Sequence, residues 1–294
     1  MLRLRKTLCR HQEVADFWHP VINEYFQGRI EKYDLRPKKP IPDNKVIWQY
    51  WGQGFAKDNL PEIVQICFDS VDKYKGDYVL IRLSDDTVGD YIDFPDFVWE
   101  KLRNNIEFTK TFFSDLLRVA LLNVYGGVWL DATVLLTAPL PPKYAEWNYF
   151  MYQRDDAEPD KKYWESMYAY YWNWKPEFKV KMLTSIFFAR KGSEVIQTLL
   201  DLILYYWKTQ DHILDYFFFQ ILYNELMESE LKDARCPLVS DVLPHYLQTK
   251  VNNESYPITM DEALKKTSIH KMAYYQPEAL ERLKLVLDSK NIKA

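Results

Sequence analysis

The sequence predicts an α/β fold in which helices flank a mostly parallel central sheet. Short apolar segments of strand character, at 45–50, 78–83, 128–130 and 185–189, alternate with longer segments of helical period. Strands that alternate with helices along a chain are typical of a doubly wound, parallel sheet. Of the 294 residues, 48% are hydrophobic and only 8 are glycine, which favours one large folded domain and argues against disorder.

The chain is expected to divide into three parts. Residues 1–40 are an N-terminal helical extension followed by a proline-rich linker, because the prolines after about residue 35 cannot continue a helix. Residues 41–275 are the main domain, which opens with the first strand. Residues 276–294 are a C-terminal amphipathic helix that packs against this domain.

Within the main domain the elements follow in order. Pro61 suits the first turn of a helix that runs to about residue 75, after which the second strand begins. After the strand at 185–189 we expect a turn and then a helix at 194–208. A strongly apolar helix is expected at 211–228.

The helix expected from residue 114 carries two charged residues near its start. Ser114 is a plausible N-cap, and Asp115 and Arg118 are three positions apart, so they project from neighbouring points of one face. Most of the residues around them in this helix are apolar. Charged groups beside a core are usually paired, ligated or functional.

The same helix is expected to stop at a glycine pair and to lead into a strand. Gly126 and Gly127 can adopt the positive φ that ends a helix, and the buried strand at 128–130 then delivers Asp131 to its carboxyl end. Ligands of open α/β sheets bind at such strand ends. We therefore expect Asp131 to join Asp115 and Arg118 in one polar cluster. The alternative is a surface ion pair beside an aspartate that only begins a turn.

A loop with aromatic residues follows the first strand. In Gln49-Tyr50-Trp51-Gly52, Tyr50 or Trp51 would stack on a nucleotide base, and Gly52 would let the backbone approach the ligand. The alternative is an aromatic pair in the core.

The composition and net charge limit the kinds of partner and the cellular location that we expect. The formal net charge of −4 argues against nucleic acid, and no stretch of about 18 apolar residues predicts a transmembrane helix. The 3 cysteines are widely spaced, without metal-ligand or disulfide spacing, which favours a reducing, cytoplasmic setting. The N-terminal Arg3, Arg5, Lys6 and Arg10 predict either a helix exposed to solvent or a partner, or peripheral contact with the inner face of the plasma membrane.

Aromatic residues gather in one further segment. The rings at 163–174 are expected to be either core or a platform for an acceptor sugar, since aromatic faces stack on pyranoses. They are Tyr163, Trp164, Tyr168, Tyr170, Tyr171, Trp172 and Trp174.

The motifs carry a family resemblance. Ser-Asp-Leu-Leu-Arg at 114–118, followed by Tyr-Gly-Gly-Val-Trp-Leu-Asp-Ala-Thr at 125–133, resembles the bacterial capsular polysaccharide synthesis glycosyltransferases. This family is similar to the yeast initiating mannosyltransferases and, more remotely, to the clostridial glucosylating toxins. The resemblance includes 47–52 and covers about 41–275. It implies a GT-A fold, a nucleotide-sugar donor, and a saccharide or lipid-linked saccharide acceptor.

The resemblance also implies roles for residues. Asp115 and Arg118 would hold hydroxyls of the donor sugar, and Gly127 and the loop at 49–51 would belong to the donor site. Asp131 would act in catalysis and bind a divalent cation, Mn²⁺ or Mg²⁺. Most relatives have Asp-x-Asp here, whereas this chain has Thr133 at the third position, and a hydroxyl is a poorer ligand for a hard cation.

Two explanations for the departure stay open. Either Asp131 binds the metal with help from elsewhere, or cationic side chains replace the ion. Ile269-His270-Lys271 resembles a late segment of related transferases in which a His and often a Lys reach the metal and the diphosphate. His270 is therefore a candidate metal ligand and Lys271 a candidate donor-binding residue.

Asp215 has two interpretations. It precedes an apolar helix and suits an N-cap, or it is the general base that an inverting transferase needs beside the acceptor hydroxyl. Retaining enzymes need no such base, and the residues do not decide between the two.

The leading hypothesis is a glycosyltransferase of bacterial surface-polysaccharide assembly. A non-catalytic carbohydrate-binding or scaffold protein with a degenerate site is the alternative, because of Thr133. A nucleotidyltransferase is less favoured, since the loop at 49–55 lacks the cations of a phosphate loop.

Overall fold

The computed structural model describes residues 2–292 except 57, 59 and 168–170. Its centre is a sheet of five strands in the order β2-β1-β3-β6-β5, in which β6 runs against the other four. The predicted α/β class with a mostly parallel sheet is therefore confirmed. The strands of this sheet are β1 (Val46–Tyr50), β2 (Val79–Leu83), β3 (Gly127–Leu130), β5 (Tyr149–Gln153) and β6 (Met182–Ala189).

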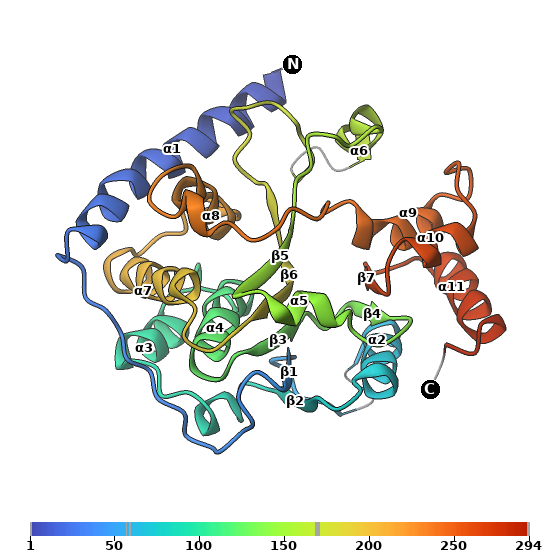
Figure 1. The fold of residues 1–294 in the computed structure, drawn as a ribbon, viewed down its shortest axis with the longest axis horizontal. Coiled ribbons are helices and arrows are strands. Elements are labelled where there is room, and N and C mark those ends of the chain that lie inside the picture. The colour runs from blue at the N-terminus through green and yellow to red at the C-terminus, as the bar shows by residue number, and fades with distance from the viewer. Residues whose placement is uncertain (1, 57, 59, 168–170, 293–294) are drawn as a thin grey trace.

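Helices cover both faces of the sheet (Figure 1). On one face α4 packs against β1, β3 and β6, with α3, α7 and α8 beside it and α1 outside them; α2 and α5 lie on the other face. The helices are α1 (Leu2–Phe26), α2 (Glu62–Tyr74), α3 (Asp96–Asn104), α4 (Lys110–Tyr125), α5 (Pro142–Glu146), α6 (Lys161–Met167), α7 (Glu194–Thr209), α8 (Phe218–Glu228), α9 (Tyr246–Asn252), α10 (Met260–Lys266) and α11 (Pro277–Ser289).

A two-stranded antiparallel ribbon extends the site-bearing region. It pairs β4 (Val134–Leu136), which follows Asp131, with β7 (Ile269–Lys271). This pairing brings the chain near its C-terminal end against the carboxyl end of β3, although more than a hundred residues separate the two in sequence.

The N-terminal helix is shorter than expected and packs closely. It ends at Phe26 and not near residue 35, and the chain then runs without regular structure to β1. Trp18 is fully buried, and its indole donates a hydrogen bond to the Phe218 carbonyl at 3.1 Å. Because α1 packs along α8, it shares the main core and is more than an appendage.

One further helix begins later than expected, and another forms as expected. The helix expected at 211–228 begins only at Phe218, because the Asp215 carboxylate accepts a hydrogen bond from the Phe217 amide and forms a turn before it. The C-terminal helix α11 forms as expected and buries Leu283 and Leu287 in a second core cluster with α2 and α9. No helix among the described residues is both long and apolar enough to span a bilayer.

Candidate active site

Helix α4 carries the first two charged residues of the site. It begins at Lys110 after Thr109, four residues earlier than expected, so Ser114 lies inside the helix and is not its N-cap. The Ser114 side chain instead takes part in the site, because its hydroxyl and its carbonyl both accept hydrogen bonds from the Arg118 guanidinium at 3.1 Å. Asp115 and Arg118 thus lie on one face of a long, buried helix.

A glycine turn connects α4 to β3 and fixes the position of Asp131. Gly126 ends the helix with φ +71°, as predicted, and Gly127 follows with φ +99°. A Cβ on Gly127 would lie 2.2 Å from the Val46 carbonyl oxygen, so only glycine fits against β1. Gly127 is buried at the start of β3, at the opposite end from Asp131. The structure thus gives Gly127 the role of letting β1 and β3 approach, and its place in the donor site stays a prediction.

The three charged residues meet at the carboxyl end of β3. Arg118 Nη1 lies 3.3 Å from Asp115 Oδ1, and Arg118 Nη2 lies 3.5 Å from Asp131 Oδ1. The Trp129 indole donates a hydrogen bond of 2.7 Å to Asp131 Oδ1, and the guanidinium lies over the Trp129 ring. We call Asp115, Arg118 and Asp131 the Arg118 cluster. The structure brings the three together as expected, while their roles stay predictions.

The cluster opens to solvent through one residue. The side chain of Asp131 is 29% exposed, against 9% for Asp115 and 4% for Arg118. Although Nη1 of Arg118 is within ion-pair distance of Asp115, it has no hydrogen-bond partner among the described residues. A ligand oxygen that reached this N–H would satisfy a buried donor that is otherwise costly to leave unpaired.

Burial sets the protonation of Asp115. Desolvation raises the pKa of this carboxyl from 3.8 to about 6; the Arg118 charge opposes the rise and the Asp131 charge adds to it. Asp115 is therefore closer to its protonated form than an ordinary aspartate, and at mildly acidic pH its hydroxyl can donate a hydrogen bond.

Lys271 reaches the site from β7. Its ammonium donates to Thr133 Oγ1 at 2.7 Å and to the Met272 carbonyl at 2.9 Å. Burial lowers the pKa of Lys271, and the Asp131 charge opposes that shift. The third N–H of the ammonium remains for a ligand. Lys271 borders a cavity of about 290 Å³, which we call the Lys271 cavity.

Aromatic side chains form one wall of the Lys271 cavity, namely Tyr171, Trp172 and Tyr274. Of the aromatic segment predicted as an acceptor platform, Trp164 and Trp172 are almost fully buried. Tyr168 and Tyr170 lie outside the described residues. Only part of the segment can therefore face a ligand.

A buried ion pair that the sequence did not indicate supports this wall. Arg154 binds Asp241 through Nε at 3.1 Å, and its other nitrogens donate to the carbonyls of Tyr171 and Asn173 at 2.7 and 2.8 Å. The guanidinium also lies over the Trp172 ring, 4.6 Å from its centre. In the sequence there is little signal for Arg154, which directly follows the apolar segment 149–153.

The loop after β1 is placed partly as expected. Gln49 is fully buried and accepts a hydrogen bond from Arg82 Nε, while its amide nitrogen has no hydrogen-bond partner among the described residues, so its donor-binding role stays a prediction. Tyr50 is 8% exposed and donates to Asp85, and both residues border a separate cavity of about 430 Å³. Trp51 is partly buried against the second core cluster. Tyr50 and Trp51 therefore stay candidates for contact with the base.

His270 lies on the other face of β7 from Lys271. Side chains of adjacent strand residues point to opposite faces, so His270 turns away from the face on which Lys271 reaches Thr133. It is fully buried, its Nε2 lies 3.1 Å from Thr137 Oγ1, and burial lowers its pKa to about 3. This geometry does not support the role of His270 as a metal ligand, which stays a prediction.

The remaining residues do not fit a divalent cation. No three His, Cys, Asp or Glu side chains converge on a metal position among the described residues. Asp131 faces the Arg118 guanidinium, and the Thr133 hydroxyl is bound by an ammonium group. Two cations thus lie where the resemblance implies a metal ion.

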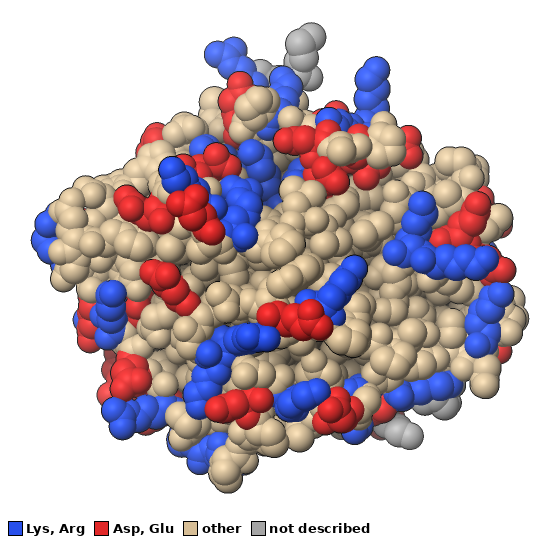
Figure 2. All heavy atoms as spheres, in the orientation of Figure 1, with Lys and Arg blue, Asp and Glu red and all other residues tan. Residues whose placement is uncertain are grey.

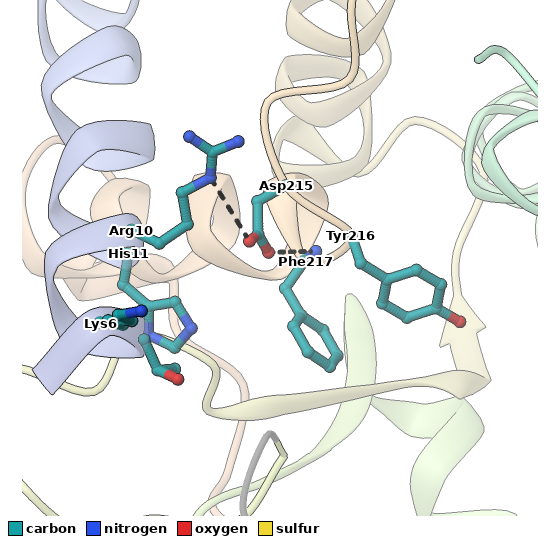
Figure 3. A pocket seen from close by; sticks show the side chains of 7 residues that line it. Lys6, Arg10, His11, Asp215, Tyr216 and Phe217 are labelled. Carbon is teal, nitrogen blue, oxygen red and sulfur yellow. Dashed lines mark hydrogen bonds and ion pairs between the residues drawn. The ribbon is translucent and has the colours of Figure 1, made fainter. Parts of the chain in front are cut away.

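Asp215 lies on another side of the site. Its carboxylate closes the turn before α8 and lies 3.9 Å from Arg10 Nε on α1 (Figure 3). This geometry fits the N-cap-like interpretation. The next residue, Tyr216, packs its ring on Phe112 of α4, one turn before Asp115.

Comparisons with known proteins identify the family. A family model described as "Capsular polysaccharide synthesis protein" matches residues 3–288. Among solved structures the chain is similar to one titled "PaToxG Glycosyltransferase", at 12% sequence identity and a TM-score of 0.35, over 78% of this chain and 82% of that chain. The search of curated proteins found no match. Because the family model spans nearly every residue, the chain belongs to the capsular polysaccharide synthesis protein family.

Proposed function

We propose that this protein is a glycosyltransferase that moves a sugar from a nucleotide-sugar donor to a saccharide acceptor in surface-polysaccharide assembly. The Arg118 cluster is the observation that carries the proposal. Two carboxyl groups and a guanidinium, nearly enclosed at the carboxyl edge of a parallel sheet, offer donors and acceptors that suit sugar hydroxyls. The adjoining Lys271 cavity adds a cation for phosphate.

The reaction makes two demands on the site. The negative charge of the leaving diphosphate must be stabilised, and the donor sugar must be held in place. The bond between the anomeric carbon and the diphosphate oxygen breaks, and the acceptor oxygen bonds to that carbon as its hydroxyl loses a proton. The leaving diphosphate gains negative charge, which nearby cations stabilise. Positively charged side chains that are already in place need little rearrangement during the reaction.

Lys271 meets the first demand in this proposal. With two of its N–H groups bound to Thr133 and Met272, the ammonium is held in one position and keeps one N–H for a phosphate oxygen. Because the residues present do not fit a metal ion, Lys271 supplies the charge that the resemblance assigns to Mn²⁺ or Mg²⁺.

The Arg118 cluster meets the second demand by holding the sugar. Asp131 is the exposed member and contacts the donor sugar directly. Arg118 and Trp129 fix its carboxylate, so the hydroxyls of the sugar meet an acceptor whose position is already set. In this proposal the acceptor contacts the aromatic wall of the Lys271 cavity.

Donor hydrolysis tests the proposal. The protein is incubated with UDP- and GDP-linked hexoses, with Mn²⁺ or with EDTA, and free nucleoside diphosphate is measured. We expect release from at least one donor in both conditions. In Asp131→Asn the rate of release should fall by at least about tenfold, because a charge-assisted contact is removed. The control is Asp233→Asn, an exposed carboxylate outside the cluster.

Two results of this experiment would contradict the proposal. Release that needs Mn²⁺ and stops in EDTA would contradict the role given to Lys271. Equal release by the wild type and Asp131→Asn would remove Asp131 from the reaction.

The hydrogen bond between Lys271 and Thr133 also favours a second candidate, a binding protein without catalysis. Here the ammonium serves only to hold β7 against the loop before β4. Such a protein would be stabilised thermally by a saccharide or a nucleotide but would release no nucleoside diphosphate from any donor.

A further inference from the structure

His245 borders the Lys271 cavity and has no role in the interactions described above. It ends the short helical turn Leu243–His245, which packs against β7, the strand that carries Lys271. Its ring is nearly enclosed, at 7% exposed, and meets the Trp172 ring edge to face with 5.1 Å between centres. The cavity thus contains an imidazole beside its aromatic wall.

The surroundings of this ring determine which nitrogen carries the proton. His245 Nδ1 lies 2.7 Å from the Asp241 carbonyl oxygen, which can only accept a hydrogen bond, so Nδ1 is the donor. Burial lowers the pKa of His245 to about 3, and the charges of Lys271 and Arg154 act in the same direction, so the ring is neutral at pH 7. A neutral ring with its proton on Nδ1 has a lone pair on Nε2.

Asp241 holds the ring in this orientation. Its backbone amide donates to the Gln153 carbonyl at 2.8 Å, and its carboxylate, which is fully buried, binds Arg154 Nε at 3.1 Å. The segment whose carbonyl receives the Nδ1–H is therefore fixed through both its backbone and its side chain. The direction of the Nε2 lone pair is fixed with it.

Nε2 of His245 is an acceptor that is open to the cavity. It has no hydrogen bond to another described residue, and it is not enclosed as the unpartnered Nδ1 of His270 is. Lys271 borders the same cavity and offers an N–H with positive charge. An unprotonated phosphate oxygen suits this ammonium and is disfavoured at the Nε2 lone pair, whereas a sugar hydroxyl can donate to Nε2.

We propose that His245 determines specificity on the acceptor side of the site. Its Nε2 accepts a hydrogen bond from a hydroxyl of the acceptor sugar, whose ring lies against Tyr274, the exposed member of the aromatic wall. A sugar without this hydroxyl is rejected, because it leaves the lone pair without a partner. This inference rests on the proposed glycosyltransferase function and adds a residue to it.

NMR of protein with ¹⁵N-labelled histidine tests the contact directly. The chain has 5 histidines, and the signals lost in His245→Asn identify those of His245. We expect the Nε2 resonance to lie in the range of an unprotonated ring nitrogen. It should move toward the protonated range when at least one of the methyl glycosides of glucose, galactose and mannose is added, because a hydroxyl then donates to the lone pair. Inorganic phosphate should leave it unchanged.

Two substitutions of His245 separate recognition from structure. His245→Asn keeps an N–H near the position of Nδ1 for the Asp241 carbonyl and removes the acceptor at Nε2. His245→Gln brings an amide oxygen near the position of Nε2 and leaves the Asp241 carbonyl without its donor. We expect His245→Asn to be the more stable of the two in urea unfolding, yet to bind the glycoside at least about fivefold more weakly than His245→Gln. Asp233→Asn should bind like the wild type.

Three results would overturn the proposal. They are a protonated Nε2 in the free protein, an Nε2 resonance that none of the three glycosides moves, and binding by His245→Asn as tight as that of the wild type. Donor hydrolysis is measured on the same wild-type samples. Release of nucleoside diphosphate together with any of these results would remove His245 from the acceptor side while the proposed function stands. A glycoside bound at Nε2 without release from any donor would instead contradict the transferase and support the binding protein.

Discussion

Arg118 organises the candidate site at the scale of single residues. Its guanidinium is held by the carbonyl and hydroxyl of Ser114 and lies between two carboxyl groups, one nearly enclosed and one partly exposed. The cost of burying these charges is offset only where each has a partner. Asp115 shows that the offset is incomplete, since burial raises its pKa although Arg118 lies beside it.

This raised pKa predicts a dependence of stability on pH. The native state holds the Asp115 proton up to about pH 6, whereas the unfolded chain loses it near 3.8. Between these values the native state binds more protons, so the free energy of unfolding falls as pH rises, by up to about 3 kcal/mol. Asp115→Asn should remove this part of the slope.

Urea unfolding at several pH values between 4 and 7 measures the effect. The difference between the wild type and Asp115→Asn isolates Asp115 from other buried carboxyls such as Asp241, whose pKa burial also raises. Parallel stability curves for the two proteins would show that Asp115 is not the titrating group. Asp233→Asn should follow the wild type at every pH.

At the scale of elements, the α4–β3 unit positions the cluster. The helix supplies Asp115 and Arg118, the strand supplies Asp131, and the glycine pair lets the strand return beside β1. Gly127 has both a positive φ and a backbone oxygen where a Cβ would be. Its contribution is therefore structural, although it lies in the motif on which the family resemblance rests.

Gly127→Ala is expected to be strongly destabilising. A Cβ 2.2 Å from the Val46 carbonyl oxygen forces β1 and β3 apart, which should lower the free energy of unfolding by at least about 3 kcal/mol. Gly192→Ala is the matched control, because Gly192 has φ +82° but no atom within 4 Å of the added carbon. It should cost only about 1–2 kcal/mol from backbone strain. Similar losses measured by urea unfolding in both variants would contradict the steric explanation.

Local patterns predicted most of the elements and missed those that depend on distant partners. The apolar strands at β1, β2, β3 and β6 and the helices α2, α7 and α11 were found from periodicity and turn residues. β5 was missed, because its aromatic sequence has no clear period. β4 and β7 were missed as strands since three-residue segments form a sheet only by pairing with each other.

At the scale of the whole molecule, the sheet gathers the site from remote segments. The carboxyl ends of the parallel strands bring Tyr50 and Asp131 to one edge, and the β4–β7 pair adds Lys271. Sequence spacing predicted that Asp115, Arg118 and Asp131 would meet because all three belong to one helix–turn–strand unit. It did not indicate that His270 would lie on the other face from Lys271, because the alternation of faces could be applied only once 269–271 was known to be a strand.

One face of the molecule shows no extended surface of a single charge. On the face shown in Figure 2, Lys and Arg side chains are interspersed with Asp and Glu. The charges that the proposed function uses are those of the Arg118 cluster and of Lys271.

The most direct test of the central claim compares affinity for a nucleotide sugar with affinity for its nucleoside diphosphate alone. If the Arg118 cluster holds the donor sugar, Asp131→Asn should weaken the nucleotide sugar by about tenfold or more and change the diphosphate by less than about twofold. Calorimetric titration of both ligands into the wild type, Asp131→Asn and Asp233→Asn gives the comparison. Equal weakening of both ligands in Asp131→Asn, or no weakening of either, would contradict the account.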